Sequence, residues 1–142
     1  MTKGKQEIRF CLHGPPVPWH RPKQSRSNRI DGRGVRRYKD QDDIAYQTGI
    51  GLEATSAMMR WAHENGIPWD AEGEWCVDID AYVPDLRRRD KDNIGKNVLD
   101  GLSGICFDDD NQVVDGRVTK RLSRTMPRTI VTVYRVEGYL EE

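Results

Sequence analysis

The stretch from Pro84 to Asp115 holds eight aspartates, and a short apolar stripe inside it limits how this part of the chain can fold. The stripe recurs at helical spacing and consists of Ile94, Val98, Leu99 and Leu102. This spacing predicts a short helix over Asp92–Leu102, with Asp92 as its N-cap. Because the stripe must face the core, Asp92 and Lys96 must point outward together, and Asp100 continues the same polar face.

Periodic segments elsewhere in the chain predict the remaining elements. Residues that alternate between apolar and polar predict strands at Gln6–His13 and Glu74–Val83. Apolar residues at spacings of three and four predict a helix over Asp40–Asn65, capped by Asp40 and ended by Gly66. Two further strands are expected at Val113–Leu122 and Arg128–Val136. The order predicts the α/β class: a small mixed β-sheet of about four strands with two helices, in a single domain over residues 1–142.

Charge is strongly separated along the chain, although 23 basic residues balance 23 acidic ones. The segment Gly14–Tyr38 carries seven Arg or Lys against one acid, and Gly116–Arg135 carries six and no acid. The segment of residues 14–38 is rich in proline, glycine and serine, so we expect a flexible loop without regular structure. Two basic flanks around an aspartate cluster favour a polyanion partner whose phosphates approach bound metal ions.

Several classes of protein do not fit this composition. No apolar run approaches the roughly 18 residues of a membrane span, and the N-terminus lacks a signal peptide, so we expect a cytoplasmic protein that does not contact a membrane. The three cysteines are an odd number, which favours reduced, buried thiols over disulfides. The histidines are scattered, without zinc-site spacing, and are interpreted as surface or strand residues.

A second acidic group, Asp108–Asp110, follows the predicted helix of residues 92–102 and precedes a predicted strand. Carboxylates that enter from two loops at neighbouring strand ends can share hard divalent cations such as Mg²⁺. For any single aspartate a capping or turn role is the simpler reading. For the whole set beside arginines, a metal site is the favoured interpretation, because so many crowded carboxylates repel one another without a cation.

These residues also resemble a known family. The sequence PDLRRRDKDNIGKNVLDGL, followed by FDDDNQVVDGRVTK, is similar to the signature of the RusA-type Holliday junction resolvases. The signature is an arginine-rich stretch, D-x-D-N, a lysine four residues after the second Asp, and then D-D-x-Q-V. The resemblance is close over residues 78–122 and extends more weakly to the proline-rich basic segment Gly14–Lys23.

The resemblance implies a set of site residues. Asp90, Asp92 and Asp110 would bind the metal, with Asp109 possible because the run of three aspartates allows a one-residue slip. Lys96 would stabilise the transition state. DNA contacts are expected from Arg87, Arg88, Arg89, Asn93, Arg21 and Lys23. The family also implies an intertwined homodimer, which would explain the low hydrophobic content of 36% because part of the core would lie between subunits.

The predicted function is therefore a Mg²⁺-dependent endodeoxyribonuclease, with Mn²⁺ as a possible cofactor. It would resolve four-way DNA junctions by paired, symmetric nicks through a metal-activated water. Two alternatives remain open at this stage. One is a non-catalytic DNA-binding module whose aspartates are structural, and the other is a metal nuclease that acts on other branched or duplex DNA.

Overall fold

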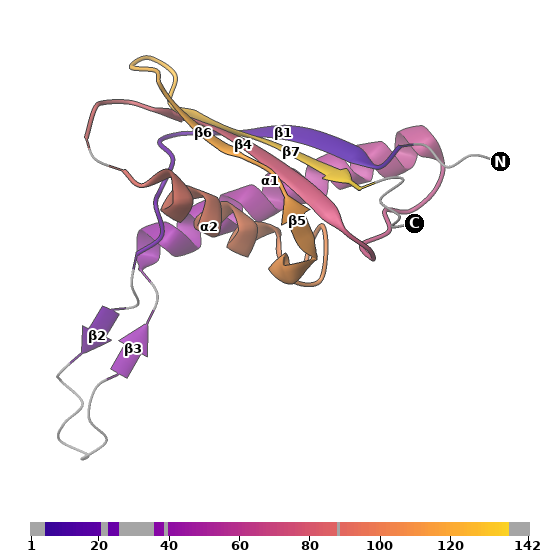
Figure 1. The fold of residues 1–142 in the computed structure, drawn as a ribbon, viewed down its shortest axis with the longest axis horizontal. Helices are drawn as coiled ribbons and strands as arrows, with labels where there is room; N and C mark the ends of the chain where they lie inside the picture. The colour runs from indigo at the N-terminus through magenta and orange to yellow at the C-terminus, as the bar shows by residue number, and fades with distance from the viewer. Residues whose placement is uncertain (1–4, 21–22, 26–35, 39, 88, 137–142) are drawn as a thin grey trace.

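The computed structural model describes residues 5–20, 23–25, 36–38, 40–87 and 89–136, with backbone alone for 23–25 and 36–38. Its main feature is a five-stranded mixed sheet in the order β1, β7, β4, with β5 and β6 both lying along the free edge of β4 (Figure 1). The strands are β1 (Glu7–His13), β4 (Trp75–Val83), β5 (Val113–Asp115), β6 (Val118–Leu122) and β7 (Arg128–Arg135). Strand β7 is antiparallel to β1 and β4, whereas β5 and β6 are parallel to β4. The predicted mixed α/β sheet is confirmed.

The sheet contains one strand more than expected, because the predicted strand over residues 113–122 is interrupted at Gly116. This glycine has a φ of 143°, and a Cβ added there would overlap the carbonyl oxygen of Val77. Only glycine permits this conformation and this close approach. Pairing then resumes where the Ile79 amide donates to the carbonyl oxygen of Arg117 at 2.9 Å. The chain therefore follows the edge of β4 as two short strands.

Two helices, α1 (Gln41–Asn65) and α2 (Lys91–Leu102), cover the same face of this sheet (Figure 1). Helix α1 begins as predicted, with the Asp40 side chain accepting the amide of Asp42 at 2.8 Å, and ends at Gly66 with a φ of 70°. The core joins the helices to the inner faces of β1, β4 and β7, with Ile8, Phe10, Ile50, Trp61, Trp75, Val77, Val98, Leu102, Val131 and Val133 among its buried members. Burial of these side chains supplies the main driving force for the fold.

The basic segment of residues 14–38 contains regular structure, contrary to expectation. Strands β2 (Lys23–Ser25) and β3 (Arg36–Tyr38) pair antiparallel, with Lys23 opposite Tyr38, and form a ribbon apart from the main sheet (Figure 1). Neither strand contains proline or glycine, so each can supply the amide donors that a ladder needs. The rest of the expected loop at residues 21–22 and 26–35 lies outside the described residues.

Cys76 and Cys106 are buried, as predicted, Cys11 is half-buried, and all three are free thiols. Burial raises the pKa of the Cys106 thiol to about 12. Within the described part of the chain, no helix is both long enough and apolar enough to span a bilayer.

Candidate active site

The N-cap of α2 lies two residues before the predicted cap. Asp90 is the N-cap, with extended backbone at φ −77° and ψ 121°, and its side chain accepts the amide of Asp92 at 2.9 Å. The prediction that Asp92 caps the helix is wrong, because Asp90 offers the same chemistry two residues earlier and has the required extended backbone. Asp92 instead lies exposed in the first turn, where the helix dipole favours a carboxylate.

The polar face of α2 has the predicted orientation. Ile94, Val98 and Leu102 have 0% exposed surface, whereas Asp92 and Lys96 are exposed. The ammonium of Lys96 lies 3.9 Å from the centroid of the Trp19 ring, a cation–π contact that joins α2 to the segment before β2. The ammonium of Lys96 is therefore held against an aromatic side chain, a contact that no local sequence pattern indicates.

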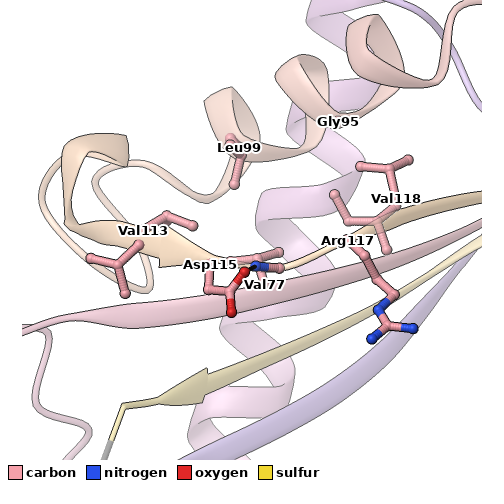
Figure 2. A pocket seen from close by; sticks show the side chains of 10 residues that line it. Val77, Gly95, Leu99, Val113, Asp115, Arg117 and Val118 are labelled. Carbon is pink, nitrogen blue, oxygen red and sulfur yellow. Dashed lines mark hydrogen bonds between the residues drawn. The ribbon is translucent and has the colours of Figure 1, made fainter. Parts of the chain in front are cut away.

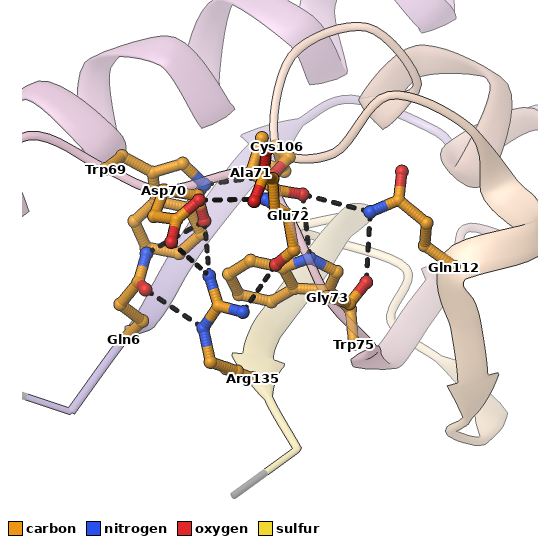
Figure 3. Close-up of polar contacts among 10 residues, drawn as sticks. All are labelled: Gln6, Trp69, Asp70, Ala71, Glu72, Gly73, Trp75, Cys106, Gln112 and Arg135. Atoms are coloured by element: carbon orange, nitrogen blue, oxygen red, sulfur yellow. Dashed lines mark hydrogen bonds and ion pairs between the residues drawn. The ribbon is translucent and has the colours of Figure 1, made fainter.

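The second acidic group forms a turn that Gln112 holds in place. A 3₁₀ helix, η2 (Asp110–Gln112), is capped by Asp109, and the side-chain oxygen of Gln112 accepts the amides of Asp108 and Asp109 at 2.8 and 3.0 Å. The side-chain nitrogen of Gln112 donates to the carbonyl oxygens of Ala71 and Gly73, both at 3.0 Å (Figure 3). One glutamine thus ties the acidic turn to the loop that precedes β4.

That loop is itself held by Arg135, as Figure 3 shows. The guanidinium donates to the side chain of Gln6 at 2.9 Å, to the carbonyl oxygen of Asp70 at 2.6 Å and to that of Glu72, and it stacks over Trp75 at 4.5 Å. Arg135 therefore has a structural role. Arg128 is likewise engaged, with its guanidinium 3.9 Å from the centroid of Tyr82. These two residues belong to the basic flank over residues 116–135, so that flank offers fewer free charges to a partner than its sequence implies.

The short helix η2, which carries Asp110, contacts α2, so the acidic turn lies beside that helix. The pKa of Asp110 is raised, first by a hydrogen bond with the carboxyl of Asp109 and then by desolvation and by the charges of Asp109 and Asp100. Lys96 acts in the opposite direction and lowers it. Asp110, Asp109, Asp100 and Lys96 are thus close enough to influence one another, and they join residues of α2 to residues of η2.

The predicted metal ligands fall into two groups, Asp90 with Asp92 at the start of α2 and Asp109 with Asp110 in the turn. Asp90, Asp92 and Asp110 do not have ligand atoms within 4.8 Å of one another in the described chain. The one set that meets this distance among the described residues is His20, Asp40 and Asp43. The assignment of Asp90, Asp92 and Asp110 as metal ligands therefore stays a prediction.

The predicted DNA-binding residues have different surroundings. Arg87 is exposed, whereas the side chain of Arg89 is only 12% exposed and bonds Asp85 at 2.7 Å, which lowers the pKa of that carboxyl. The carbonyl oxygen of Asn93 accepts the amide of Trp19 at 2.9 Å. Arg21 and Arg88 lie outside the described residues, and Lys23 is described by its backbone alone. Their DNA contacts also stay predictions.

A pocket of about 340 Å³ lies between α2 and the junction of β5 with β6 (Figure 2). Most of the residues that line it are apolar, with Gly95 and Leu99 contributed by α2 and Val118 by β6, while Asp115 and Arg117 are the charged residues of its lining. A Cβ at position 95 would lie 2.9 Å from Val118, so glycine lets α2 approach the sheet closely.

The protein is a small α/β domain with a mixed sheet covered by one layer of helices. Two groups of carboxylates, at the start of α2 and at η2, lie in a chain whose exposed residues include many basic ones. The chain belongs to the endodeoxyribonuclease RusA family, whose model matches residues 13–134. The resemblance seen in the sequence is confirmed, and it extends beyond the motif to most of the chain. Comparison with curated protein sequences gave no match.

Proposed function

We propose that this protein is a divalent-metal-dependent endodeoxyribonuclease that resolves four-way DNA junctions. The observation that carries the proposal is the contact between η2 and α2, which brings the acidic turn beside the helix that carries Asp92 and Lys96. The influence of Asp109, Asp100 and Lys96 on the pKa of Asp110 agrees with this placement. Family membership supplies the reaction class, cleavage of DNA within a strand. Carboxylates on α2 and η2 and the exposed ammonium of Lys96 are groups that this reaction could use, which supports the proposal.

The donor set suits a hard cation. Asp90, Asp92 and Asp110 would hold Mg²⁺ or Mn²⁺, because carboxylate oxygens are the ligands that these ions prefer. Asp90 uses one oxygen to cap α2, and its carboxylate has a second oxygen for a cation. The paired carboxyls of Asp109 and Asp110 repel each other when both are ionised, and a cation relieves that repulsion. A divalent ion supplies this chemistry with a water acidic enough to yield hydroxide near neutral pH.

Lys96 provides positive charge that does not depend on a cation. Its ammonium is exposed and is steadied by the Trp19 ring. A phosphodiester gains negative charge on its oxygens as it is attacked, and a fixed ammonium stabilises that charge. Lys96 would therefore act on the transition state more strongly than on the bound substrate.

Basic side chains along β6 and the following turn would contact the DNA backbone. Arg117, Lys120, Arg121 and Arg124 are all exposed, and the Lys120 ammonium donates to the carbonyl oxygen of Arg89 at 2.6 Å. Phosphate contacts of this kind make binding strongly dependent on salt. A two-fold homodimer would present two equivalent sites, which suits symmetric incision of two strands of a junction.

The test compares synthetic four-way, three-way and linear DNA with and without Mg²⁺. We expect two symmetric nicks in the four-way junction, only when the cation is present. Binding without cleavage in both Mg²⁺ and Mn²⁺ would identify a non-catalytic module instead. Equal cleavage of linear duplex would identify a metal nuclease without junction selectivity.

A further inference from the structure

The buried carboxylate of Asp43 holds His20, which precedes strand β2 in the chain, in a fixed orientation. The ring Nδ1 of His20 lies 2.9 Å from one oxygen of Asp43, and the backbone amide of His20 donates to the other oxygen at 3.0 Å. A carboxylate can only accept, so Nδ1 carries the proton of this bond. The side chain of Asp43 is 3% exposed, whereas that of His20 is 46% exposed. Because Nδ1 is engaged with Asp43, Nε2 is the ring nitrogen that this half-exposed side chain can offer to a ligand.

Asp43 is fixed by a network that sequence reasoning did not detect. The side-chain amide of Asn97, on α2, donates to Asp43 at 3.1 Å and to the carbonyl oxygen of Val17 at 2.9 Å, and it accepts from Gln47 at 2.8 Å. Asn97 is fully buried. Asp43 also lies in the first turn of α1, where the helix dipole favours negative charge. These partners explain how the fold tolerates a buried carboxylate, and they make the position of His20 rigid.

The location of His20 connects it to the DNA-binding elements. One residue earlier, the backbone amide of Trp19 donates to the carbonyl oxygen of Asn93, and the Trp19 ring makes the cation–π contact with Lys96. One residue later, the chain enters the basic segment that contains Arg21 and Lys23. His20 thus lies between the proposed transition-state lysine and the most basic part of the sequence, on a segment bonded to both helices.

We propose that His20, oriented by Asp43, binds a DNA phosphate beside the proposed cleavage site. In the imidazolium form Nδ1–H donates to Asp43 and Nε2–H donates to a phosphate oxygen. A charge-assisted bond to phosphate is among the stronger hydrogen bonds that a side chain can make. The inference rests on the proposed function, since it takes DNA as the substrate.

A cation held by His20, Asp40 and Asp43 is the competing interpretation of this cluster. Both oxygens of Asp43 already accept hydrogen bonds, from the His20 amide, the His20 ring and Asn97. A metal would have to displace these donors from a buried carboxylate. The bonds therefore favour an orienting role for Asp43 and leave Nε2 of His20 as the atom that meets a ligand.

Two substitutions separate phosphate binding from a merely structural link. In His20→Asn the amide nitrogen can take the place of Nδ1 and keep the bond to Asp43, but nothing replaces Nε2. In His20→Gln the amide nitrogen can reach the place of Nε2, but the bond to Asp43 is lost. His63→Asn, at an exposed histidine near the end of α1, is the matched control. Binding of a labelled four-way junction is measured in EDTA over a series of salt concentrations, together with urea unfolding of each variant.

We expect His20→Asn to bind the junction roughly tenfold more weakly than the parent while unfolding at the same urea concentration. Its plot of log affinity against log salt should be shallower by about 0.9, the slope of one phosphate contact. His20→Gln should bind better than His20→Asn and unfold more easily, and His63→Asn should match the parent.

Three outcomes would overturn the inference. If His20→Asn binds the junction as tightly as the parent, His20 does not bind phosphate and has only the structural bond to Asp43. Parental binding with slow cleavage on addition of Mg²⁺ would place His20 in catalysis instead. Failure of the unsubstituted protein to bind any DNA would overturn the proposed function itself, a result distinct from the other two.

Discussion

The ammonium of Lys96 lies 3.9 Å from the centroid of the Trp19 ring, so the segment before the β2–β3 ribbon is attached directly to the polar face of α2. A cation–π contact of this kind contributes about 0.5–2 kcal/mol, enough to bias the rotamer of a long side chain. The contact makes Trp19 a positioning residue for the proposed catalytic lysine.

Replacement of Lys96 by alanine should slow cleavage by about 10²–10³-fold, because preorganised positive charge at the reacting phosphate is lost. Replacement of Trp19 by leucine keeps Lys96 but removes the cation–π contact that orients it, so the cleavage rate should fall by less than about tenfold. Single-turnover cleavage of a four-way junction measures both. A loss for Trp19→Leu as large as that for Lys96→Ala would mean that the ring acts in some other way.

Substitutions of Asp90 should separate its capping role from its proposed role in metal binding. Asparagine caps helices as well as aspartate does, so Asp90→Asn should leave the free energy of unfolding unchanged and abolish cleavage. Asp90→Ala should also abolish cleavage and lose about 1 kcal/mol of stability. Urea unfolding and junction cleavage give the two readouts, with Glu64→Gln, an exposed carboxylate near the end of α1, as the control. An active Asp90→Asn protein would remove Asp90 from the metal site.

The pH dependence of cleavage should report the pairing of Asp109 with Asp110. Because the Asp109 carboxyl raises the pKa of Asp110, Asp110 gains its proton at a higher pH than an ordinary aspartate as the solution is acidified. Cleavage, which needs the ionised carboxylate, should therefore decline early on the acidic side. Asp109→Asn should lower the pKa of Asp110 and move this acidic limb to lower pH.

Asp108→Asn is the control for that experiment, since Asp108 is exposed and does not contribute to the raised pKa of Asp110. Its acidic limb should match that of the parent. Complete loss of cleavage in Asp109→Asn, at every pH, would instead assign the essential carboxylate to Asp109 and shift the motif by one residue.

Gln112 should matter for both stability and cleavage. Its side chain accepts from Asp108 and Asp109 and donates to Ala71 and Gly73, so Gln112→Ala loses four hydrogen bonds. We expect a loss of about 1–3 kcal/mol in the free energy of unfolding and slower cleavage, because the turn that carries Asp110 is loosened. Urea unfolding and single-turnover rates measure the two effects. Unchanged cleavage at saturating Mg²⁺ would show that the turn holds its shape without this link.

Gly116 should tolerate no side chain. Gly116→Ala combines a φ of 143° with a collision against the Val77 carbonyl, whereas Gly104→Ala has a φ of 82° with no atom within 4 Å of the new Cβ. We expect Gly104→Ala to lose about 1–2 kcal/mol from backbone strain alone. Gly116→Ala should lose about 3 kcal/mol or more, as strain and overpacking add. Equal losses in urea unfolding would mean that the strand edge yields to the added methyl group.

The sequence predicted those elements whose signals are local. The apolar stripe of α2 and the Asp40 cap of α1 depend on residues within a few positions of one another, and both have the predicted roles. The N-cap of α2 was misplaced because Asp90 and Asp92 have the same chemistry, and only the backbone angles distinguish them. The interruption between β5 and β6 at Gly116 depends on the close approach of Val77, which is distant in sequence, so no local pattern predicts it.

The surroundings of the site were less accessible to sequence reasoning. His20, Asp43 and Asn97 come from a loop and two helices, with separations of 23 and 54 residues, and packing alone brings them together. In the sequence, Arg135 is one of several basic residues in a charged flank. Its structural role depends on hydrogen bonds to Gln6, Asp70 and Glu72, which are distant in the chain. Long-range hydrogen bonds of this kind leave no periodic trace in the chain.

Asp90 caps the start of α2 and, in the proposed site, would also bind the ion, so folding of the helix start and occupancy of the site would be thermodynamically linked. A ligand that binds only the native state raises the free energy of unfolding by RT ln(1 + L/Kd), where L is the ligand concentration, so the melting temperature rises with ligand concentration. Calorimetry in rising Mg²⁺ or Mn²⁺, with no nucleic acid added, therefore measures the affinity of the site directly. Chelation should fray the first turn of α2 before it disturbs the sheet, and hydrogen exchange at the amide of Asp92 would detect this.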